Sequence, residues 1–170
     1  MIIGLSGHAR SGKDTAADHL VAHGWQKRAI ADPIKRIALA YPLVESVVNE
    51  VGWEEAKKVE WIRPLLQRIG AAIREEFGGQ FLAIQALTRW IPSPVSSPSV
   101  VITDVRTHAE YFVIKHYGGT VIRITRPGVG PANGDVTEQV IGCDYEIVND
   151  GSIEDLHAKL DAVLKEIGGV

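Results

Sequence analysis

Short apolar runs separated by longer periodic segments give this chain an alternating pattern. Such runs, bounded by turn residues, are typical of strands that are buried on both faces of a parallel sheet. The segments between them repeat apolar residues every three or four positions, as amphipathic helices do. Strands that alternate with helices predict an α/β fold with a central five-stranded parallel sheet and helices on both faces. The predicted strands are 1–5, 25–30, 100–102, 121–124 and 145–148.

The most regular helical pattern begins at Pro64 and ends at Gly78-Gly79, since glycine commonly follows the last helical turn. Spacings of three and four predict a buried stripe along this helix. That stripe consists of Leu66, Ile69, Ile73 and Phe77. A second, mostly polar stripe lies about one residue further round the helix. Its members are Arg63, Gln67, Gly70 and Arg74.

The remaining helices and loops are marked mainly by capping and breaking residues. Asp32 suits the N-cap of a helix and Pro33 its first position. Pro42 interrupts the apolar pattern of the segment that begins at Asp32. Ser152 is expected to cap the last helix. The segment 126–140 is rich in glycine and proline, which predicts a mobile loop over a site. Further helices are predicted at 80–90 and 107–117.

One stretch reads G-x-x-x-x-G-K, which is the motif of a phosphate-binding loop. It lies between the first predicted strand and the first predicted helix, which is the structural context that such a loop requires. Gly7 and Gly12 let the backbone turn tightly, so that its N–H groups point at phosphate oxygens. The N-terminus of the helix favours the same anion, and Lys13 supplies a charge for the terminal phosphates. The alternative is a glycine-rich turn with a surface lysine. The predicted ATP-binding residues are Gly7, Arg10, Ser11, Gly12, Lys13, Asp14 and Thr15.

The loop departs from the usual motif at one position. Asp14 stands where serine or threonine ordinarily holds the magnesium ion, and Thr15 follows it. A carboxylate is also a hard oxygen ligand, so Asp14 is expected to bind Mg²⁺ directly or through water. Thr15 offers a hydroxyl one residue later.

Composition and charge exclude several classes of protein. With 170 residues the chain is long enough for one domain with a real core, and its net charge of −3 marks neither a nucleic-acid nor a membrane surface. No apolar run approaches the roughly 18 residues of a membrane span, so a cytosolic protein is expected. The single cysteine, Cys143, excludes an internal disulfide and is expected to be structural. The six histidines show no metal-ligand spacing and are interpreted as scattered over the surface.

Candidate chemistry also follows the predicted third and fourth strands. In open parallel sheets ligands bind at the carboxyl ends of the strands, and Asp104, Arg106 and Arg126 all come from loops at that edge. Phosphoryl transfer depends on converging cations, which the two arginines would supply beside Lys13. Asp104 is suited to orient a magnesium-bound water or the acceptor. Its alternative role is to cap the following helix.

These motifs together identify a resemblance. The chain resembles the P-loop deoxynucleoside monophosphate kinases that are found in bacteriophages, over most of its length. Matching segments include the Gly-Lys-Asp-Thr variant of the loop, so the departure at Asp14 is itself a trait of this family. The segments are Leu5 to Gly7, Gly12 to Thr15, Asp32 to Lys35, Arg63 to Gly70 with Arg74, Asp104 to Arg106 with Glu110, Gly118 to Arg123, Arg126 to Gly128, Thr137-Glu138 and Asn149 to Gly151. One departure concerns the lid, where Asp135, Val136 and Thr137 replace a histidine followed by Ser-Glu.

The resemblance implies the P-loop NTPase fold of the nucleoside monophosphate kinase type, in a single domain over 1–170. It implies a helical acceptor-binding insertion at about 32–90 and a lid loop at about 126–140. The implied reaction moves the γ-phosphate of ATP, with Mg²⁺, to a deoxynucleoside monophosphate for DNA synthesis. The implied partners are these small molecules, and a homodimer is also compatible with the resemblance. The implied location is the cytoplasm, which is that of the host if the chain is of phage origin. The implied catalytic residues are Lys13, Asp104, Arg106 and Arg126.

The polar stripe is expected to face the acceptor. Arginine binds phosphate bidentately, which suits Arg63 and Arg74, and the amide of Gln67 can read the edge of a base. The alternative for the stripe is a solvated helix face, because charged side chains are mostly exposed. Lys35 is either a further contact to the acceptor phosphate or a surface charge.

Two other functions stay open on the sequence. A kinase of another small acceptor, such as dephospho-coenzyme A, would share the fold and the magnesium site. A non-catalytic ATP-binding module would keep Lys13 but would not need the polar stripe. A GTPase is disfavoured because the Asn-Lys-x-Asp guanine signature is missing from the sequence.

Overall fold

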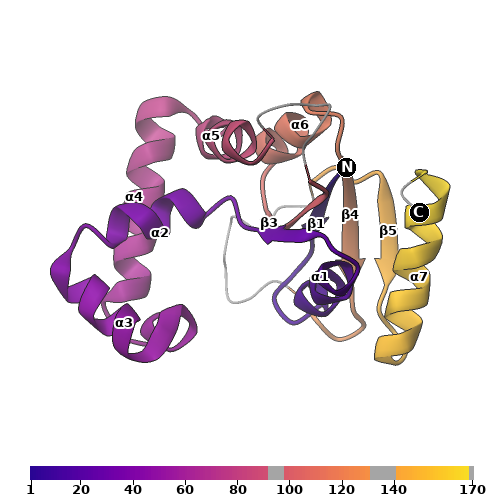
Figure 1. Cartoon of the computed structure of the whole chain (residues 1–170), viewed down its shortest axis with the longest axis horizontal. Coiled ribbons are helices and arrows are strands. Elements are labelled where there is room, and N and C mark those ends of the chain that lie inside the picture. The colour runs from indigo at the N-terminus through magenta and orange to yellow at the C-terminus, as the bar shows by residue number, and fades with distance from the viewer. Residues whose placement is uncertain (92–97, 131–140, 169–170) are drawn as a thin grey trace.

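The computed structural model describes residues 1–91, 98–130 and 141–168. Its centre is a sheet whose strands lie in the order β2-β3-β1-β4-β5, and every neighbouring pair is parallel (Figure 1). The prediction of a five-stranded parallel sheet is therefore confirmed. The strands are β1 (Ile2–Ser6), β2 (Gln26–Arg28), β3 (Val100–Val105), β4 (Thr120–Thr125) and β5 (Tyr145–Val148).

Helices cover both faces of the sheet, and alternation along β1 shows how the sequence divides between them. Ile3 and Leu5 are fully buried in one cluster with Leu20 of α1 (Lys13–Ala22) and Leu160 of α7 (Ile153–Glu166). Ile2 faces the opposite side and lies in a second cluster, which includes residues of α5 (Phe81–Trp90) and α6 (His108–His116). Two-residue periodicity thus places a separate hydrophobic core on each face of the sheet.

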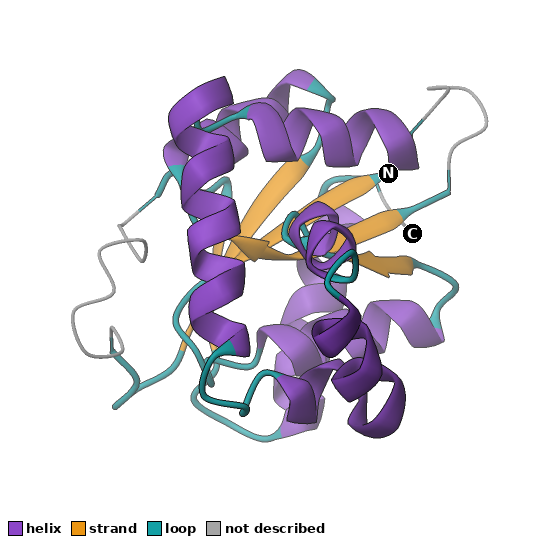
Figure 2. Cartoon of the chain, turned by 90° about the vertical axis from the view of Figure 1, so that its left-hand side faces the viewer, coloured by secondary structure: helices purple, strands orange, loops and turns teal. Residues whose placement is uncertain are grey.

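Three helices between β2 and β3 form a helical lobe beside the sheet. They are α2 (Asp32–Ala38), α3 (Pro42–Ala56) and α4 (Ile62–Phe77). Figure 1 shows this helical lobe on the left, separated from α1, and Figure 2 shows its helices in front of the strands. Ile34 of α2 packs close to Gly70 of α4, where an added Cβ would lie 2.9 Å from the Ile34 side chain. The short residue at position 70 therefore lets the two helices approach each other.

Three local expectations were wrong. Pro42 does not end a helix but occupies the first turn of α3, where its missing N–H has no partner to lose. The break in that helix is at Gly52, whose φ of 75° is accessible mainly to glycine. Ala31, not Asp32, is the N-cap of α2. Phe77 is 56% exposed and stacks on Phe81, so it does not belong to the core.

The other caps and terminators agree with the sequence. Ser152 caps α7 through a reciprocal capping box with Asp155, and Gly78 follows the last turn of α4 with a φ of 86°. Cys143 is half-buried and packs against the hydrophobic core. Within the described ranges, no helix is long and apolar enough to cross a bilayer.

The histidines are less scattered than expected. The rings of His19 on α1 and His157 on α7 stack with their centroids 4.0 Å apart, and the ring of His23 lies 4.6 Å from that of His19. Nε2 of His19 is also 2.8 Å from a carboxylate oxygen of Asp161. These contacts join the helix that follows the phosphate loop to the C-terminal helix.

Candidate active site

The loop between β1 and α1 is pressed against the ends of β4 and β5, and this close approach explains both of its glycines. A Cβ on Gly7, whose φ is 132°, would collide with the carbonyl oxygen of Ile124. A Cβ on Gly12, whose φ is 109°, would lie 2.5 Å from Nδ2 of Asn149. Arg10 also has a positive φ, of 68°. Alternating backbone conformations of this kind turn successive N–H groups toward one point, which suits an anion.

Two side chains hold the curled loop in place. The ammonium group of Lys13 donates to the carbonyl oxygens of Gly7 and His8, each at 2.6 Å. Asn149, which follows β5, donates from Nδ2 to the buried carbonyl of Ser11 at 2.9 Å. Lys13 therefore lies over the loop to which the sequence assigned it, and the loop is fixed to a distant strand by Asn149. Residue type alone gave no signal of this second contact.

Asp14 points away from the core and toward β2. Its side chain is 83% exposed and forms an ion pair of 3.0 Å with Lys27, which also pairs with Asp18 at 2.9 Å. Burial alone would lower the pKa of Lys27, but hydrogen bonds and charge from Asp18 and Asp14 raise it overall. An exposed carboxylate paired to one lysine still has lone pairs that can accept further contacts.

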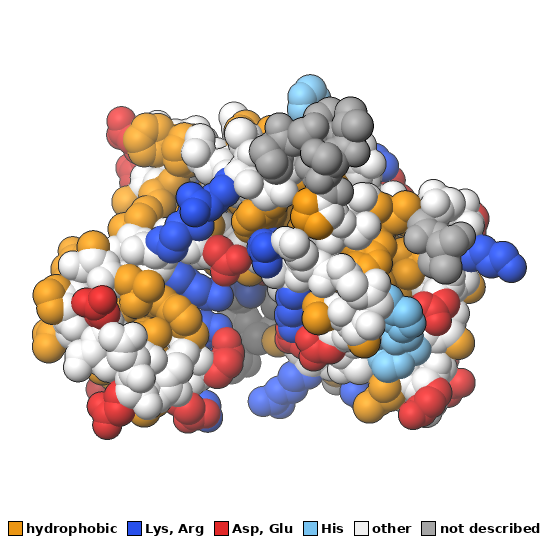
Figure 3. All heavy atoms as spheres, viewed as in Figure 1, with side chains coloured by type: hydrophobic (Ala, Val, Ile, Leu, Met, Phe, Trp, Pro, Cys, Tyr) orange, Lys and Arg blue, Asp and Glu red, His pale blue; other side chains and the backbone are white. Residues whose placement is uncertain are grey.

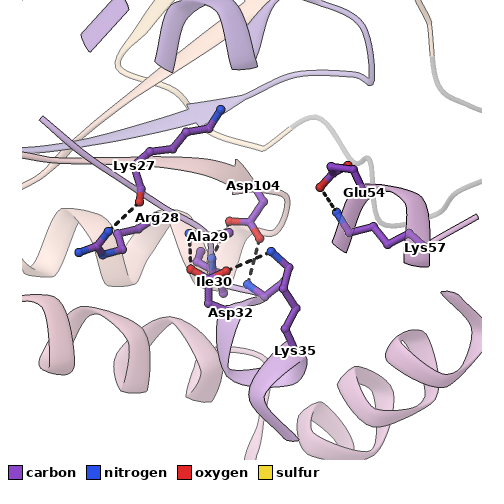
Figure 4. A network of polar contacts seen from close by, with 10 residues as sticks. Lys27, Arg28, Ala29, Ile30, Asp32, Lys35, Glu54, Lys57 and Asp104 are labelled. Carbon is purple, nitrogen blue, oxygen red and sulfur yellow. Dashed lines mark hydrogen bonds and ion pairs between the residues drawn. The ribbon is translucent and has the colours of Figure 1, made fainter. Parts of the chain in front are cut away.

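Asp104 connects β3 to the start of the helical lobe. Its two carboxylate oxygens accept hydrogen bonds from the backbone N–H groups of Ile30, at 2.7 Å, and Ala31, at 3.0 Å (Figure 4). The alternative role of capping α6 is wrong, because Thr107 is the cap of that helix. Burial raises the pKa of Asp104, and these hydrogen bonds and the charge of Arg106 oppose that rise.

Lys35 lies beside the same turn. Its ammonium group is 3.2 Å from Oδ1 of Asp32, whose other oxygen accepts from the backbone N–H of Ala29 at 3.0 Å. Figure 4 shows Lys35 close to Asp104, and Glu54 of α3 across from both. A hydrogen bond from Lys57 lowers the pKa of Glu54, and the charges of Lys35 and Asp14 also affect it. The helical lobe therefore faces the start of α1 across this part of the molecule.

Glu110 is a buried residue whose role was not predicted from the sequence. It is 2% exposed, and one of its oxygens accepts from the backbone N–H groups of Arg106, at 2.7 Å, and Thr107, at 3.0 Å. Burial raises the pKa of this carboxyl, while the charge of Arg74 lowers it. The guanidinium of Arg74 lies 3.1 Å from the Cβ position of Gly70, on the buried side of α4. Glu110 thus holds the backbone of Arg106 and Thr107 at the start of α6.

The remaining predicted residues lie in less protected places. Arg63 and Gln67 are exposed on α4, and α4 begins at Ile62, so Arg63 is inside the helix. Arg126 is exposed directly after β4, at the sheet edge that also carries the phosphate loop. Thr15 is half-buried in the first turn of α1. The lid positions Asp135, Val136 and Thr137 lie outside the described residues.

The arrangement of loop, sheet and helical lobe defines the fold class of the chain, the P-loop NTPase fold of the nucleoside monophosphate kinase type. Shikimate kinase from Aquifex aeolicus has a similar fold, with 12% identity, a TM-score of 0.51 and coverage of 99% of this chain and 98% of that one. The protein TT1252 of Thermus thermophilus is similar at 19% identity and a TM-score of 0.50, over 98% of this chain and 97% of that one.

The chain belongs to the deoxynucleotide monophosphate kinase family, whose model matches residues 43–160. A protein of Acanthamoeba polyphaga mimivirus, provisionally named a deoxynucleotide monophosphate kinase, is 26% identical over 94% of each chain. The deoxynucleotide monophosphate kinase of Escherichia phage RB69 is 34% identical over 38% of this chain and 28% of its own length. Viral relatives therefore agree with the resemblance seen in the sequence.

Proposed function

We propose that this chain transfers the γ-phosphate of ATP to a deoxynucleoside monophosphate and releases ADP and the deoxynucleoside diphosphate. The observation that carries the proposal is that Lys35 and Asp104 lie together at the turn that leads from β2 into the helical lobe. A donor loop on one side and the cationic side chains Lys35 and Arg74 of the helical lobe on the other would provide two anion sites that share one reacting centre. Membership of the family supports this choice of acceptor.

The donor is assigned to the loop between β1 and α1. Backbone N–H groups of the loop, with Lys13 and Arg10, would surround the phosphates of ATP. Ser11 is buried, and its carbonyl bond to Asn149 keeps the loop closed when ATP leaves. This pre-formed shape reduces the ordering that ATP binding requires.

Magnesium fits the oxygen donors near this loop. Mg²⁺ is commonly bound by one or two carboxylates together with substrate phosphates and water, so a closed cage of protein ligands is not required. Asp14 is exposed with open lone pairs, and each oxygen of Asp104 accepts only one backbone hydrogen bond. We assign the ion to Asp14, Thr15 and Asp104, directly or through water. When bound, it would neutralise charge on the β- and γ-phosphates.

The acceptor is assigned to Lys35 and the polar stripe of α4. Arg74 would bind the acceptor phosphate, because it is a cationic side chain on the same helix as Gln67 and its guanidinium lies beside Gly70. Gln67 would contact the base through its amide, and Arg63 extends the stripe toward the start of the helix. An oxygen of the acceptor phosphate forms the new bond to the γ-phosphorus as the bond to the β–γ bridging oxygen breaks. Lys13, Arg106 and Arg126 would offset the negative charge that moves between these oxygens.

The setting of the reaction is also part of the proposal. We place the enzyme in the cytoplasm, in the host cytoplasm if the chain is of phage origin, where ATP and monophosphates are available. Its partners would be these small molecules, because the net charge of −3 does not favour nucleic acid. A homodimer is the expected assembly if the chain associates, and sedimentation analysis would test it.

A panel of deoxy- and ribonucleoside monophosphates, each supplied with ATP and Mg²⁺, tests the proposal. The expected result is ADP release that depends on one or more deoxynucleoside monophosphates, with matching formation of the diphosphate. ADP release without any acceptor would instead indicate an ATPase. Turnover with dephospho-coenzyme A alone would assign the chain to the other class of small-acceptor kinase.

A further inference from the structure

A cavity of about 620 Å³ lies between the edge of the sheet and the helical lobe, and of its lining residues the proposed reaction uses only Lys35. Its volume is in the range of small-molecule sites in proteins. Both the sheet side and the helical lobe contribute to its walls. The lining consists of Gln26 and Arg28 of β2, Asp32, Lys35, Arg36 and Leu39 of α2, Trp53 of α3, Arg89 and Trp90 of α5, and Pro98.

The charges around this cavity are unbalanced. Within the described part of the chain, Arg28, Arg36 and Arg89 form no ion pair, and the one acidic side chain of the lining, Asp32, is paired with Lys35. Among the described residues, Arg28 donates to two neutral acceptors, the carbonyl of Lys27 and the side chain of Gln26. Three guanidinium groups around one space repel each other unless an anion lies among them. Figure 3 shows Lys and Arg side chains gathered along the hollow between the helical lobe and the sheet.

Two tryptophans give the cavity a second property. Trp53 and Trp90 are half-buried, and they approach the cavity from the helical lobe and from the sheet side respectively. Indole rings offer flat apolar surfaces on which an aromatic ligand stacks. Guanidinium groups prefer phosphate, which they bind bidentately. A ligand that satisfies both properties carries phosphate groups and an aromatic ring, as a nucleotide does.

Strand β2 separates this cavity from the donor loop. Lys27 points to the α1 side, where it pairs with Asp14 and Asp18, whereas its neighbour Arg28 points away from Asp104 (Figure 4). The two sites thus use opposite faces of one short strand. They meet only at the start of α2, where Asp32 and Lys35 line the cavity beside the turn that Asp104 holds.

We propose that this cavity binds a second nucleotide, distinct from the donor and the acceptor. The phosphates contact Arg28, Arg36 and Arg89, and the base stacks on Trp53 or Trp90. Because the helical lobe and the sheet side both contact it, the bound nucleotide fixes the helical lobe relative to the sheet. It therefore changes acceptor turnover while the acceptor is also bound, and Lys35 is the residue that the two sites share.

Equilibrium dialysis of the full chain tests this proposal, using each of the four radiolabelled deoxynucleoside triphosphates as the probe. The donor site is first saturated with β,γ-imido ATP and Mg²⁺, and the acceptor site with an accepted monophosphate, so that no transfer occurs. At least one probe is expected to bind at about one molecule per chain. Arg36→Gln/Arg89→Gln should weaken that binding at least about tenfold, since each substitution removes a charged phosphate contact. The control is Arg68→Gln, an exposed arginine of α4 outside the lining, which should bind as wild type.

Three outcomes would overturn the proposal. No probe binding up to about 1 mM would show that the cavity has no nucleotide affinity of consequence. Equal binding by wild type and the double variant would place the probe elsewhere. A raised KM for the acceptor in the variant, with no loss of additional binding, would make the cavity part of the acceptor site. Should the double variant not fold, the exposed Arg89→Gln alone decides between these results. Dialysis with β,γ-imido ATP alone counts the binding sites for the probe without any turnover. Failure of the proposed kinase activity can therefore be distinguished from failure of the second nucleotide site.

Discussion

Asn149 at the end of β5 is bonded to the carbonyl of Ser11, which lies 138 residues earlier in the chain. The same amide occupies the space where a Cβ on Gly12 would be. The phosphate loop is therefore shaped by the far side of the sheet as well as by its own glycines. Any change that moves β5 relative to β1 is expected to affect ATP binding.

Asn149→Ala is predicted to destabilise the fold and weaken ATP binding together. The buried carbonyl of Ser11 loses its donor, which costs about 1–3 kcal/mol. Urea unfolding and the KM for ATP measure the two effects, and the KM for the acceptor should change less. Asn49→Ala, an exposed asparagine of α3, serves as the control. An unchanged ATP constant in the Asn149 variant would mean that the loop keeps its shape without this bond.

Lys13→Ala is predicted to abolish phosphoryl transfer and leave the fold intact. The ammonium group donates hydrogen bonds to two carbonyls of the loop. During transfer it would stabilise the negative charge that develops on the transferred phosphate. Steady-state turnover is the measurement, with Lys58→Ala as an exposed control. Retention of more than about a tenth of wild-type turnover would contradict a role worth more than about 1.4 kcal/mol.

Asp14→Ala is predicted to raise the Mg²⁺ requirement more than the ATP requirement at saturating metal. Asp14→Ser should be milder, because serine restores the usual ligand of the motif. Titration of Mg²⁺ at fixed ATP measures the difference. Asp18→Ala is the matched control, since it removes the other partner of Lys27 without changing the loop. If both alanine variants behave alike, the effect of Asp14 acts through Lys27 and not through the metal.

Arg74→Ala is predicted to weaken the acceptor monophosphate and spare ATP. Losing a charged contact worth about 1.5–3 kcal/mol corresponds to roughly tenfold to a hundredfold in acceptor affinity. Gln67→Ala should instead alter the ranking of bases, because a neutral amide reads a hydrogen-bond pattern. Separate titrations of ATP and of each monophosphate measure both effects, with Arg68→Ala as the control on α4. Weaker ATP binding with an unchanged monophosphate constant would assign the stripe to the donor.

Glu110→Gln is predicted to change how stability depends on pH. Burial raises the pKa of Glu110 above its usual 4.5, so the folded chain holds this proton more tightly than the unfolded chain does. Wild-type stability should therefore fall as the pH rises from about 4.5 through the raised value. The variant keeps an acceptor oxygen for Arg106 and Thr107 but has no proton to lose, so its decline should be shallower. Asp104 contributes a decline of the same sign in both proteins.

Chemical or thermal unfolding at a series of pH values makes this measurement. Glu75→Gln, an exposed residue of α4, is the control. Parallel curves for wild type and the Glu110 variant above pH 4.5 would show that the carboxyl titrates alike in both states.

The sequence predicted the features that depend on local spacing. Gly7, Gly12 and Lys13 identify the phosphate loop because the motif is contiguous. Apolar runs identify β1 and β3 because most of their residues are buried on both faces. Pro42 was misread because proline opens a helix as readily as it ends one, and only the surrounding packing decides between the two. The contact between Asn149 and Ser11 depends on the strand order, which no local pattern contains.

In the candidate site, too, the features that depend on local spacing were predictable and those that depend on packing were not. Asp104 and Arg106 follow a buried strand, so their place at the sheet edge comes from the α/β pattern. The burial of Glu110 and the effect of the Arg74 charge on it depend on how α4 and α6 both pack against α5. The cavity at Arg28 and Arg89 brings together residues that are far apart in the chain, and spacing gives no sign of it.

Strand β2 has three residues, and two of them face different sites: Lys27 faces Asp14, and Arg28 lines the cavity beside the helical lobe. Adding or deleting one residue between Gly24 and Gln26 would exchange the faces on which these two side chains lie. Surface connections usually tolerate changes of length, but this one would alter both sites with a single insertion. We therefore expect the length of the link between α1 and β2 to be constrained more strictly than its composition.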